Sequence, residues 1–222
     1  MRGVKFVSIK NKTFKRHTAD DWDLVMTKKE IGTPDVKEKL TDLADRDGVL
    51  DQTESMTGVP AFGTRPLSFS FEYLGAIEEW ADLFTEIRNF LHGQRMEIHE
   101  PDDLKYYYMG RVSVGAPTGG RVKAFTVTVK ADTWKYLTQG ETTVTEAVTA
   151  SKQIILANDW RPVCPTITTT GAVSFEFGGV NYSIAGAGTF RFPRFRLGYG
   201  DNIVTLLSGS GNITFTYHEG AM

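Results

Sequence analysis

The chain is short of the residues that most chemical sites require. It has one cysteine, Cys164, and four histidines among 222 residues. A single cysteine excludes an intrachain disulfide and favours folding in a reducing compartment. The histidines do not pair at zinc-ligand spacing, so we expect no metal site at His17, His92, His99 or His218.

A basic surplus is also missing. The formal net charge is -2 and the isoelectric point lies near 6.1, whereas non-specific nucleic-acid binders are normally basic. Local basic clusters occur at residues 10–16 and at the arginines 191, 194 and 196. Acids or aromatics interrupt them, which favours a solvated face or an interface rim over a phosphate-binding patch.

Long hydrophobic runs are absent too. No stretch approaches the roughly 18 apolar residues of a membrane-spanning helix, so we expect no membrane insertion. The first residues, MRGVK, lack the apolar core of a signal peptide. We therefore expect the protein to fold in a cytoplasm.

Catalytic patterns are likewise missing. The sequence has no GxSxG elbow and no strand–GxGxxG–helix context. The acids at 45, 47 and 51 and at 102–103 stand in turn-like segments that aspartate favours, and the first group lacks the register of a calcium loop. Cys164, between Val163 and Pro165, is typical of a small buried hydrophobe. We expect no catalytic residues, no cofactor and no enzyme.

The clearest structural signal is an alternating segment followed by an amphipathic one. Apolar side chains recur at every second position of residues 65–73, which predicts a strand buried on one face. Residues 76–91 carry apolar side chains at three- and four-residue steps and end before Gly93. This pattern predicts a single helix packed across a sheet.

Residues 44–64 form a connection too long for a compact domain, and such loops are usually functional. The preceding residues 35–43 fit either a strand or a short helix. In the ring that the resemblance given below implies, we expect the long loop to reach a neighbouring subunit, with contacts from Asp45, Arg46, Asp47, Val49, Leu50, Met56 and Phe62.

The second half changes character. Residues 138–151 fit a linker or an edge strand. Short candidate strands follow at 166–170, 173–177, 181–185, 189–192, 202–207 and 212–218, separated by glycine-rich turns. This spacing is typical of a β-sandwich. The fold class is therefore mainly β with one helix: an N-terminal α+β domain over residues 1–140 and a C-terminal β-sandwich over 141–222.

Aromatic residues supply candidate surfaces. The tyrosines 106–108 alternate in direction along a strand, so we expect at least one at a surface or a subunit contact. Trp160, Tyr182 and Tyr199 are candidates for a partner or glycan surface, because sugar rings pack on aromatic faces. Packing in the core or between subunits is the more frequent role of such residues.

Several segments together are similar to the distal tail proteins of long-tailed bacteriophages. Their order and spacing carry the resemblance: residues 45–51 (DRDGVLD), 65–71 (RPLSFSF), 80–93, 107–112 (YYMGRV), 125–132 (FTVTVKAD), 200–203 (GDNI) and 211–217 (GNITFTY). The resemblance implies a structural protein of the virion. It would form a hexameric ring at the tail tip, assembled in the host cytoplasm.

The same resemblance implies roles for the two domains. The N-terminal domain would form the ring and join the major tail tube protein to a tail-tip hub protein. The C-terminal domain would be a galectin-like sandwich that docks receptor-binding or baseplate proteins. DNA would pass through the lumen without specific binding.

The alternative is a carbohydrate-binding module that contacts the host surface through its C-terminal sandwich. Such a module needs exposed aromatics on one face and no ring. The oligomeric state and a glycan screen separate the two hypotheses. A tail-attached hydrolase has little support, since no catalytic set stands out.

Overall fold

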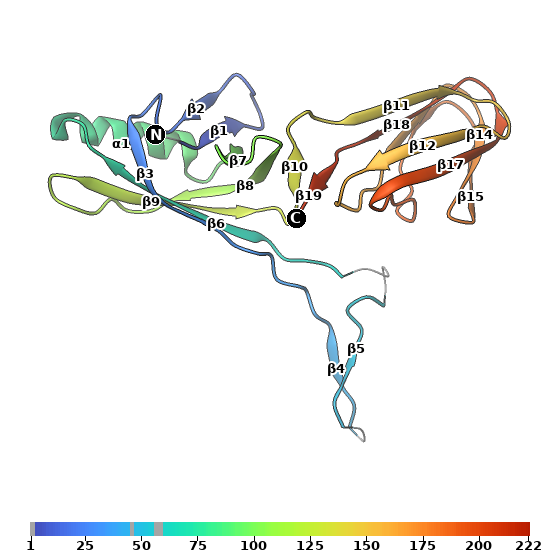
Figure 1. The fold of residues 1–222 in the computed structure, drawn as a ribbon, viewed down its shortest axis with the longest axis horizontal. Helices are drawn as coiled ribbons and strands as arrows, with labels where there is room; N and C mark the ends of the chain where they lie inside the picture. The colour runs from blue at the N-terminus through green and yellow to red at the C-terminus, as the bar shows by residue number, and fades with distance from the viewer. Residues whose placement is uncertain (1–2, 45–46, 56–59) are drawn as a thin grey trace. The chain divides into compact units, whose positions relative to one another are not determined.

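The computed structural model describes residues 3–44, 47–55 and 60–222 and is drawn in Figure 1. The described residues are mainly β with one α-helix, as the sequence predicts. The chain divides into two compact units, Met1–Thr133 and Trp134–Met222. This division falls a few residues before the expected boundary at residue 140.

Unit 1 contains one large antiparallel sheet with strand order β2-β1-β7-β8-β9-β6-β3. Two further strands, β4 and β5, pair only with each other in the described topology. The strands are β1 (Lys5–Ser8), β2 (Lys15–His17), β3 (Leu24–Ile31), β4 (Leu40–Asp42), β5 (Val49–Asp51), β6 (Arg65–Tyr73), β7 (Arg95–His99), β8 (Tyr106–Val114) and β9 (Lys123–Ala131).

Strand β6 is the centre of the unit 1 core. Leu67, Phe69 and Phe71 are buried on one face of the strand, whereas the serines between them are only half-buried. The buried side chains belong to one hydrophobic cluster with the apolar face of the helix. Burying each large apolar side chain contributes about 1.5–3 kcal/mol, so the alternation determines which face of the sheet receives the helix.

The predicted helix is confirmed, but its first turn is tighter than expected. A 3-10 turn, η1 (Ile77–Glu79), precedes the α-helix α1 (Trp80–Leu91). Neither Ala76 nor Glu79 provides a side-chain cap, and the backbone N–H of Glu79 donates to the carbonyl oxygen of Ala76. An uncapped helix start commonly satisfies its free N–H groups with such three-residue hydrogen bonds.

An ion-pair cluster ties distant strands of the sheet together. The Nζ atom of Lys29 in β3 lies 2.9 Å from Glu100 and 2.7 Å from Asp102, in the segment after β7. The hydrogen bonds that Lys29 donates to Asp102 and Glu100 raise the pKa of Lys29. Because β3 and β7 stand four positions apart in the sheet order, this cluster holds the segment after β7 over the sheet face.

The expectation for the three tyrosines is wrong: Tyr106, Tyr107 and Tyr108 are all buried. Tyr108 faces the helix-side core. Tyr107 stacks on His99, with ring centroids 5.1 Å apart. The side chains do alternate, so Tyr107 points away from the core that contains Tyr108. His99 covers Tyr107 on that opposite face, and alternation alone therefore does not place a tyrosine in solvent.

Unit 2 is a β-sandwich. Its two four-stranded sheets have the orders β11-β18-β13-β16 and β12-β17-β14-β15, and side chains of both form one core cluster. The strands are β10 (Lys135–Leu137), β11 (Thr142–Ala147), β12 (Gln153–Asn158), β13 (Thr166–Thr169), β14 (Val173–Phe177), β15 (Val180–Ile184), β16 (Gly188–Phe190), β17 (Gly200–Gly209), β18 (Asn212–Tyr217) and β19 (Gly220–Ala221).

The strands predicted between residues 166 and 218 are confirmed as β13–β18. Of the two alternatives for residues 138–151, the edge strand is present, as β11. Strand β12 has no counterpart among the predicted strands.

The Glu97 carboxylate makes a contact in unit 1 that we expect to weaken in acid. This carboxylate is buried beside Lys12 and His99. Burial raises the pKa of Glu97, but the hydrogen bonds with His99 and Lys12 lower it by more. The pKa of Glu97 therefore lies below its ordinary value. The contact therefore stabilises the folded state above the unfolded pKa, near 4.3, and the stabilisation is lost as the pH falls through the folded pKa.

We expect the unfolding free energy of unit 1 to fall more steeply on acidification in the wild type than in Glu97→Gln. Urea unfolding followed by the circular dichroism of α1 measures it between pH about 7 and about 3. Glu78→Gln, at an exposed position, controls for loss of a carboxylate. Equal acid slopes in wild type and Glu97→Gln would contradict the assignment.

Candidate interaction surfaces

The long connection between β3 and β6 contains an extended arm, formed by the described residues 32–44, 47–55 and 60–64. Its two halves continue the β3–β6 ladder outward, as Figure 1 shows for the segments that lead to β4 and β5. The ladder consists of hydrogen bonds from Gly32 N–H to Pro66, from Gly63 N–H to Asp35 and from Lys37 N–H to Ala61, with a bridge between Val36 and Phe62. Residues 35–43, undecided from sequence, are therefore extended and not helical.

The far end of the arm is a short hairpin. Strands β4 and β5 pair with Leu40 opposite Asp51 and Asp42 opposite Val49. Gly48 has a φ of 86°, which residues other than glycine adopt at a cost. The backbone N–H of Thr53 donates to Asp51 Oδ1 at 2.8 Å, and the hydrogen bonds from Thr53 lower the pKa of Asp51.

The hairpin exposes apolar side chains. Val49 is 53% exposed, and Leu40 and Leu50 are exposed as well. Three of the residues predicted to contact a neighbour, Asp47, Val49 and Leu50, meet at one small hollow of about 110 Å³. Phe62 lies away from them, opposite Val36. Asp45, Arg46 and Met56, predicted for the same contact, lie outside the described residues.

Unit 2 displays an aromatic pair at its surface. Trp160 and Tyr199 stack with ring centroids 4.0 Å apart and an interplanar angle of 12°. They are 58% and 65% exposed. The Asn158 side chain donates to the carbonyl oxygens of Arg161 and Gly198, so the two loops that carry the rings are held together.

Tyr182 does not belong to this surface, which corrects the expected grouping. It is 7% exposed and stacks on Phe175, with ring centroids 5.1 Å apart. The cause is its position in β15, where Tyr182 and Ile184 are buried and their neighbours are exposed. Burial raises the pKa of the Tyr182 hydroxyl.

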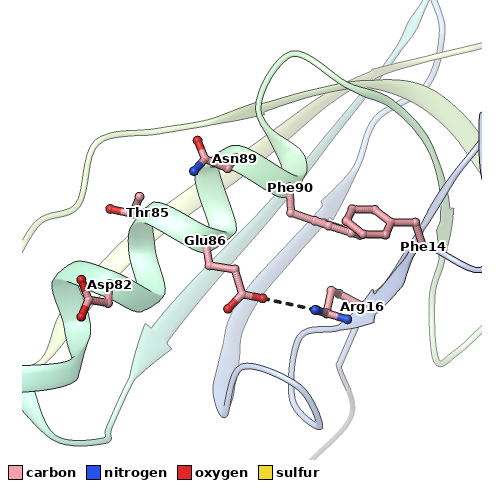
Figure 2. A pocket seen from close by; sticks show the side chains of 7 residues that line it. All are labelled: Phe14, Arg16, Asp82, Thr85, Glu86, Asn89 and Phe90. Atoms are coloured by element: carbon pink, nitrogen blue, oxygen red, sulfur yellow. Dashed lines mark hydrogen bonds and ion pairs between the residues drawn. The ribbon is translucent and has the colours of Figure 1, made fainter.

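A groove between β2 and α1 has no counterpart in the sequence predictions. Figure 2 shows Phe14 and Phe90 side by side at one end and Asp82 at the other. The two rings lie 5.0 Å apart, and Arg16 Nε lies 3.3 Å from Glu86 Oε1. The groove has a volume of about 500 Å³ and is lined by Phe14, Arg16, Asp82, Thr85, Glu86, Asn89 and Phe90.

The structure offers no assembled chemical centre in the part of the chain that it describes. No group of three or more histidine, cysteine or acidic side chains is placed there to hold a metal ion. Cys164 donates to the carbonyl oxygen of Phe192 at 3.0 Å. In the described ranges, none of the helices combines the length and the apolar character that a membrane crossing demands.

The two tyrosines should respond differently to truncation. We expect Tyr182→Ala to lower the unfolding free energy of unit 2 by about 3–5 kcal/mol, because it empties a packed core position. Tyr199→Ala should cost about 1 kcal/mol, since only an exposed stacking contact is lost. Calorimetry of the full chain compares the two variants. Similar losses would mean that the Trp160–Tyr199 pair is part of the fold's stability.

Comparison with known proteins finds a similarity in fold and none at the level of sequence families. No family model matches the chain, and no curated protein matches it. Among solved structures, the Dit protein of phage SPP1 matches 99% of this chain and 99% of its own, with a TM-score of 0.67 and 15% sequence identity. That protein is described as a paradigm of the hub adsorption apparatus in phages that infect Gram-positive bacteria. Over nearly its whole length, this chain therefore has the fold of the SPP1 Dit protein.

Proposed function

We propose that this protein is a structural component of a phage tail, the ring-shaped hub at the distal end of the tail tube. One observation carries the proposal: both units, in their order, match over 99% of the chain a protein described as a hub of the adsorption apparatus. The described residues add an exposed arm, which suits assembly better than catalysis.

The proposed assembly is a homohexamer. A closed ring needs two different patches on each subunit, because each subunit contacts its neighbours head to tail. The arm supplies one such patch, since Leu40, Val49 and Leu50 are exposed in the isolated chain. In this proposal unit 1 forms the ring, and the arm reaches the neighbouring subunit.

The hub would join several proteins of the virion. Unit 1 would meet the major tail tube protein on one side and a tail-tip hub protein on the other. Unit 2, as a galectin-like sandwich, would dock receptor-binding or baseplate proteins through surfaces such as the Trp160–Tyr199 pair. The protein would be made in the host cytoplasm and end at the tail tip.

The lumen would let DNA pass without specific binding. The face of the unit 1 sheet opposite the helix carries hydroxyl side chains, including Ser68, Ser70, Thr126 and Thr128. Ser70 and Thr126 share a hydrogen bond of 3.2 Å. Arg95, Arg111 and Lys130 stand side by side in the register of the same face, and Arg95 pairs with Asp132. The absence of specific DNA binding therefore rests on the net charge of the chain.

A second candidate function follows from the exposed aromatic pair. Two parallel rings with open outer faces are the type of surface on which sugar rings pack. The candidate is a carbohydrate-binding module that contacts the host surface through unit 2, with Trp160 as the main stacking residue. It differs from the hub in needing no ring.

The hub proposal predicts a hexamer in solution. Light scattering at two protein concentrations should give the mass of six chains, or a mass that approaches it as concentration rises. Leu50→Asp should shift the protein towards monomer, because it places a charge in the proposed contact. Val180→Asp, at another exposed strand position, is the matched control. A strict monomer at every concentration would count against a self-assembling ring.

The carbohydrate candidate predicts binding in a glycan screen with the full chain. Signals from the wild type should disappear in Trp160→Ala and persist in Val180→Asp. A screen without any signal, together with a hexamer by light scattering, would leave the hub as the sole candidate.

A further inference from the structure

The tip of the arm is predominantly acidic. In the sequence of residues 40–55, acids at 42, 45, 47, 51 and 54 outnumber the single base, Arg46. They alternate with the exposed aliphatic residues Leu40, Val49 and Leu50. A surface that covers this tip must therefore be basic and apolar at once.

The same unit carries a surface of that kind on the hairpin between β1 and β2. Residues 9–19 contain Lys10, Lys12, Lys15 and Arg16 and no acid. Phe14 stands in their midst and is 55% exposed. Lys12 and Arg16 pair with Glu97 and Glu86, whereas Lys10 and Lys15 form no ion pair among the described residues.

Phe14 also forms one wall of the groove shown in Figure 2, beside Phe90 of α1. The Arg16 guanidinium lies 5.8 Å from the centroid of the Phe90 ring and is held by Glu86. Phe14, Arg16, Glu86 and Phe90 thus contact one another at one end of the groove. With a volume of about 500 Å³, the groove has room for several aliphatic side chains of a hairpin tip.

We propose that the arm tip of one copy docks on the Phe14 groove of a second copy. Leu50 would enter the groove against Phe14, and Asp47 would face Lys10 or Lys15. The occupant is a second copy because, within the described chain, both surfaces remain exposed and their charges are opposite. The inference rests on the proposed ring, in which each subunit offers one tip and one groove.

Two physical consequences follow from this pairing. Phe14 becomes the anchor of the contact, since buried aromatic residues carry most of the free energy of an interface. The exposed charges mainly speed and orient association, and added salt screens them over about 10 Å at 0.1 M. Assembly should therefore weaken with salt and depend strongly on Phe14.

Disulfide trapping tests the contact directly. In a Cys164→Ser background, Leu50→Cys protein is mixed with Asn89→Cys protein, because Asn89 lines the groove. Oxidation should give a mixed dimer. Val180→Cys replaces Leu50→Cys in the control mixture and should give much less. With Leu50→Cys and Asn89→Cys in one chain, a ladder of covalent oligomers is expected, whereas a cross-linked monomer would show that the tip folds onto its own groove and would overturn the proposal.

Charge reversal adds an independent measurement. We expect Asp47→Lys and Lys15→Glu each to weaken self-association about tenfold or more, and their combination to restore most of it, as close charge pairs at interfaces do. Phe14→Ala should weaken it as well. Circular dichroism of each variant confirms that the fold is intact.

The outcomes separate this contact from the function on which it rests. A hexamer that survives all three variants and gives no mixed dimer would overturn the docking site and leave the hub proposal standing. A monomer at every concentration, without cross-links, would count against both. Capture of the arm by a tube protein in place of a second copy would also overturn the docking site.

Discussion

The antiparallel pairing of β3 with β6 is the constraint on which the rest of unit 1 depends. Because the two strands are antiparallel neighbours, the chain that connects them starts and ends side by side at the same end of the sheet. The ladder therefore continues past Gly32 and Pro66 and ends in the β4–β5 hairpin. The register is held by the side chains of β6 under α1, since a slip of one residue would turn Phe69 and Phe71 towards solvent.

The exposed apolar surfaces are formed by residues that lie outside the two hydrophobic cores. Val49 and Leu50 lie at the end of the arm, beyond the sheet, and Trp160 and Tyr199 lie in loops that join strands of the sandwich. Each surface is shaped by local polar contacts, from Thr53 to Asp51 and from Asn158 to two loop carbonyls. Ordering these segments in advance lowers the entropy cost of a later contact.

Much of the fold could be predicted from the sequence, because β6, α1 and β13–β18 have regular patterns. Strand β12 escaped prediction because Ile154, Ile155 and Leu156 are consecutive apolar residues that hide the period of two, and Ile155 points outward. Tyr182 could not be told from Trp160 and Tyr199, since the side of a strand that faces the core depends on its partner sheet. The Phe14 groove depends on the packing of β2 beside a helix about seventy residues further along the chain, which no local pattern contains.

The two core clusters share no residue. The last residue of the first cluster is Ala131, and the first residue packed against the second cluster is the partly buried Val144. Each unit thus has a packed core made of its own side chains. Substitutions that remodel the sandwich surface then leave the packing of the first unit unchanged. In the proposed hub, such a chain could exchange what unit 2 presents while the proposed assembly surfaces of unit 1 stay constant.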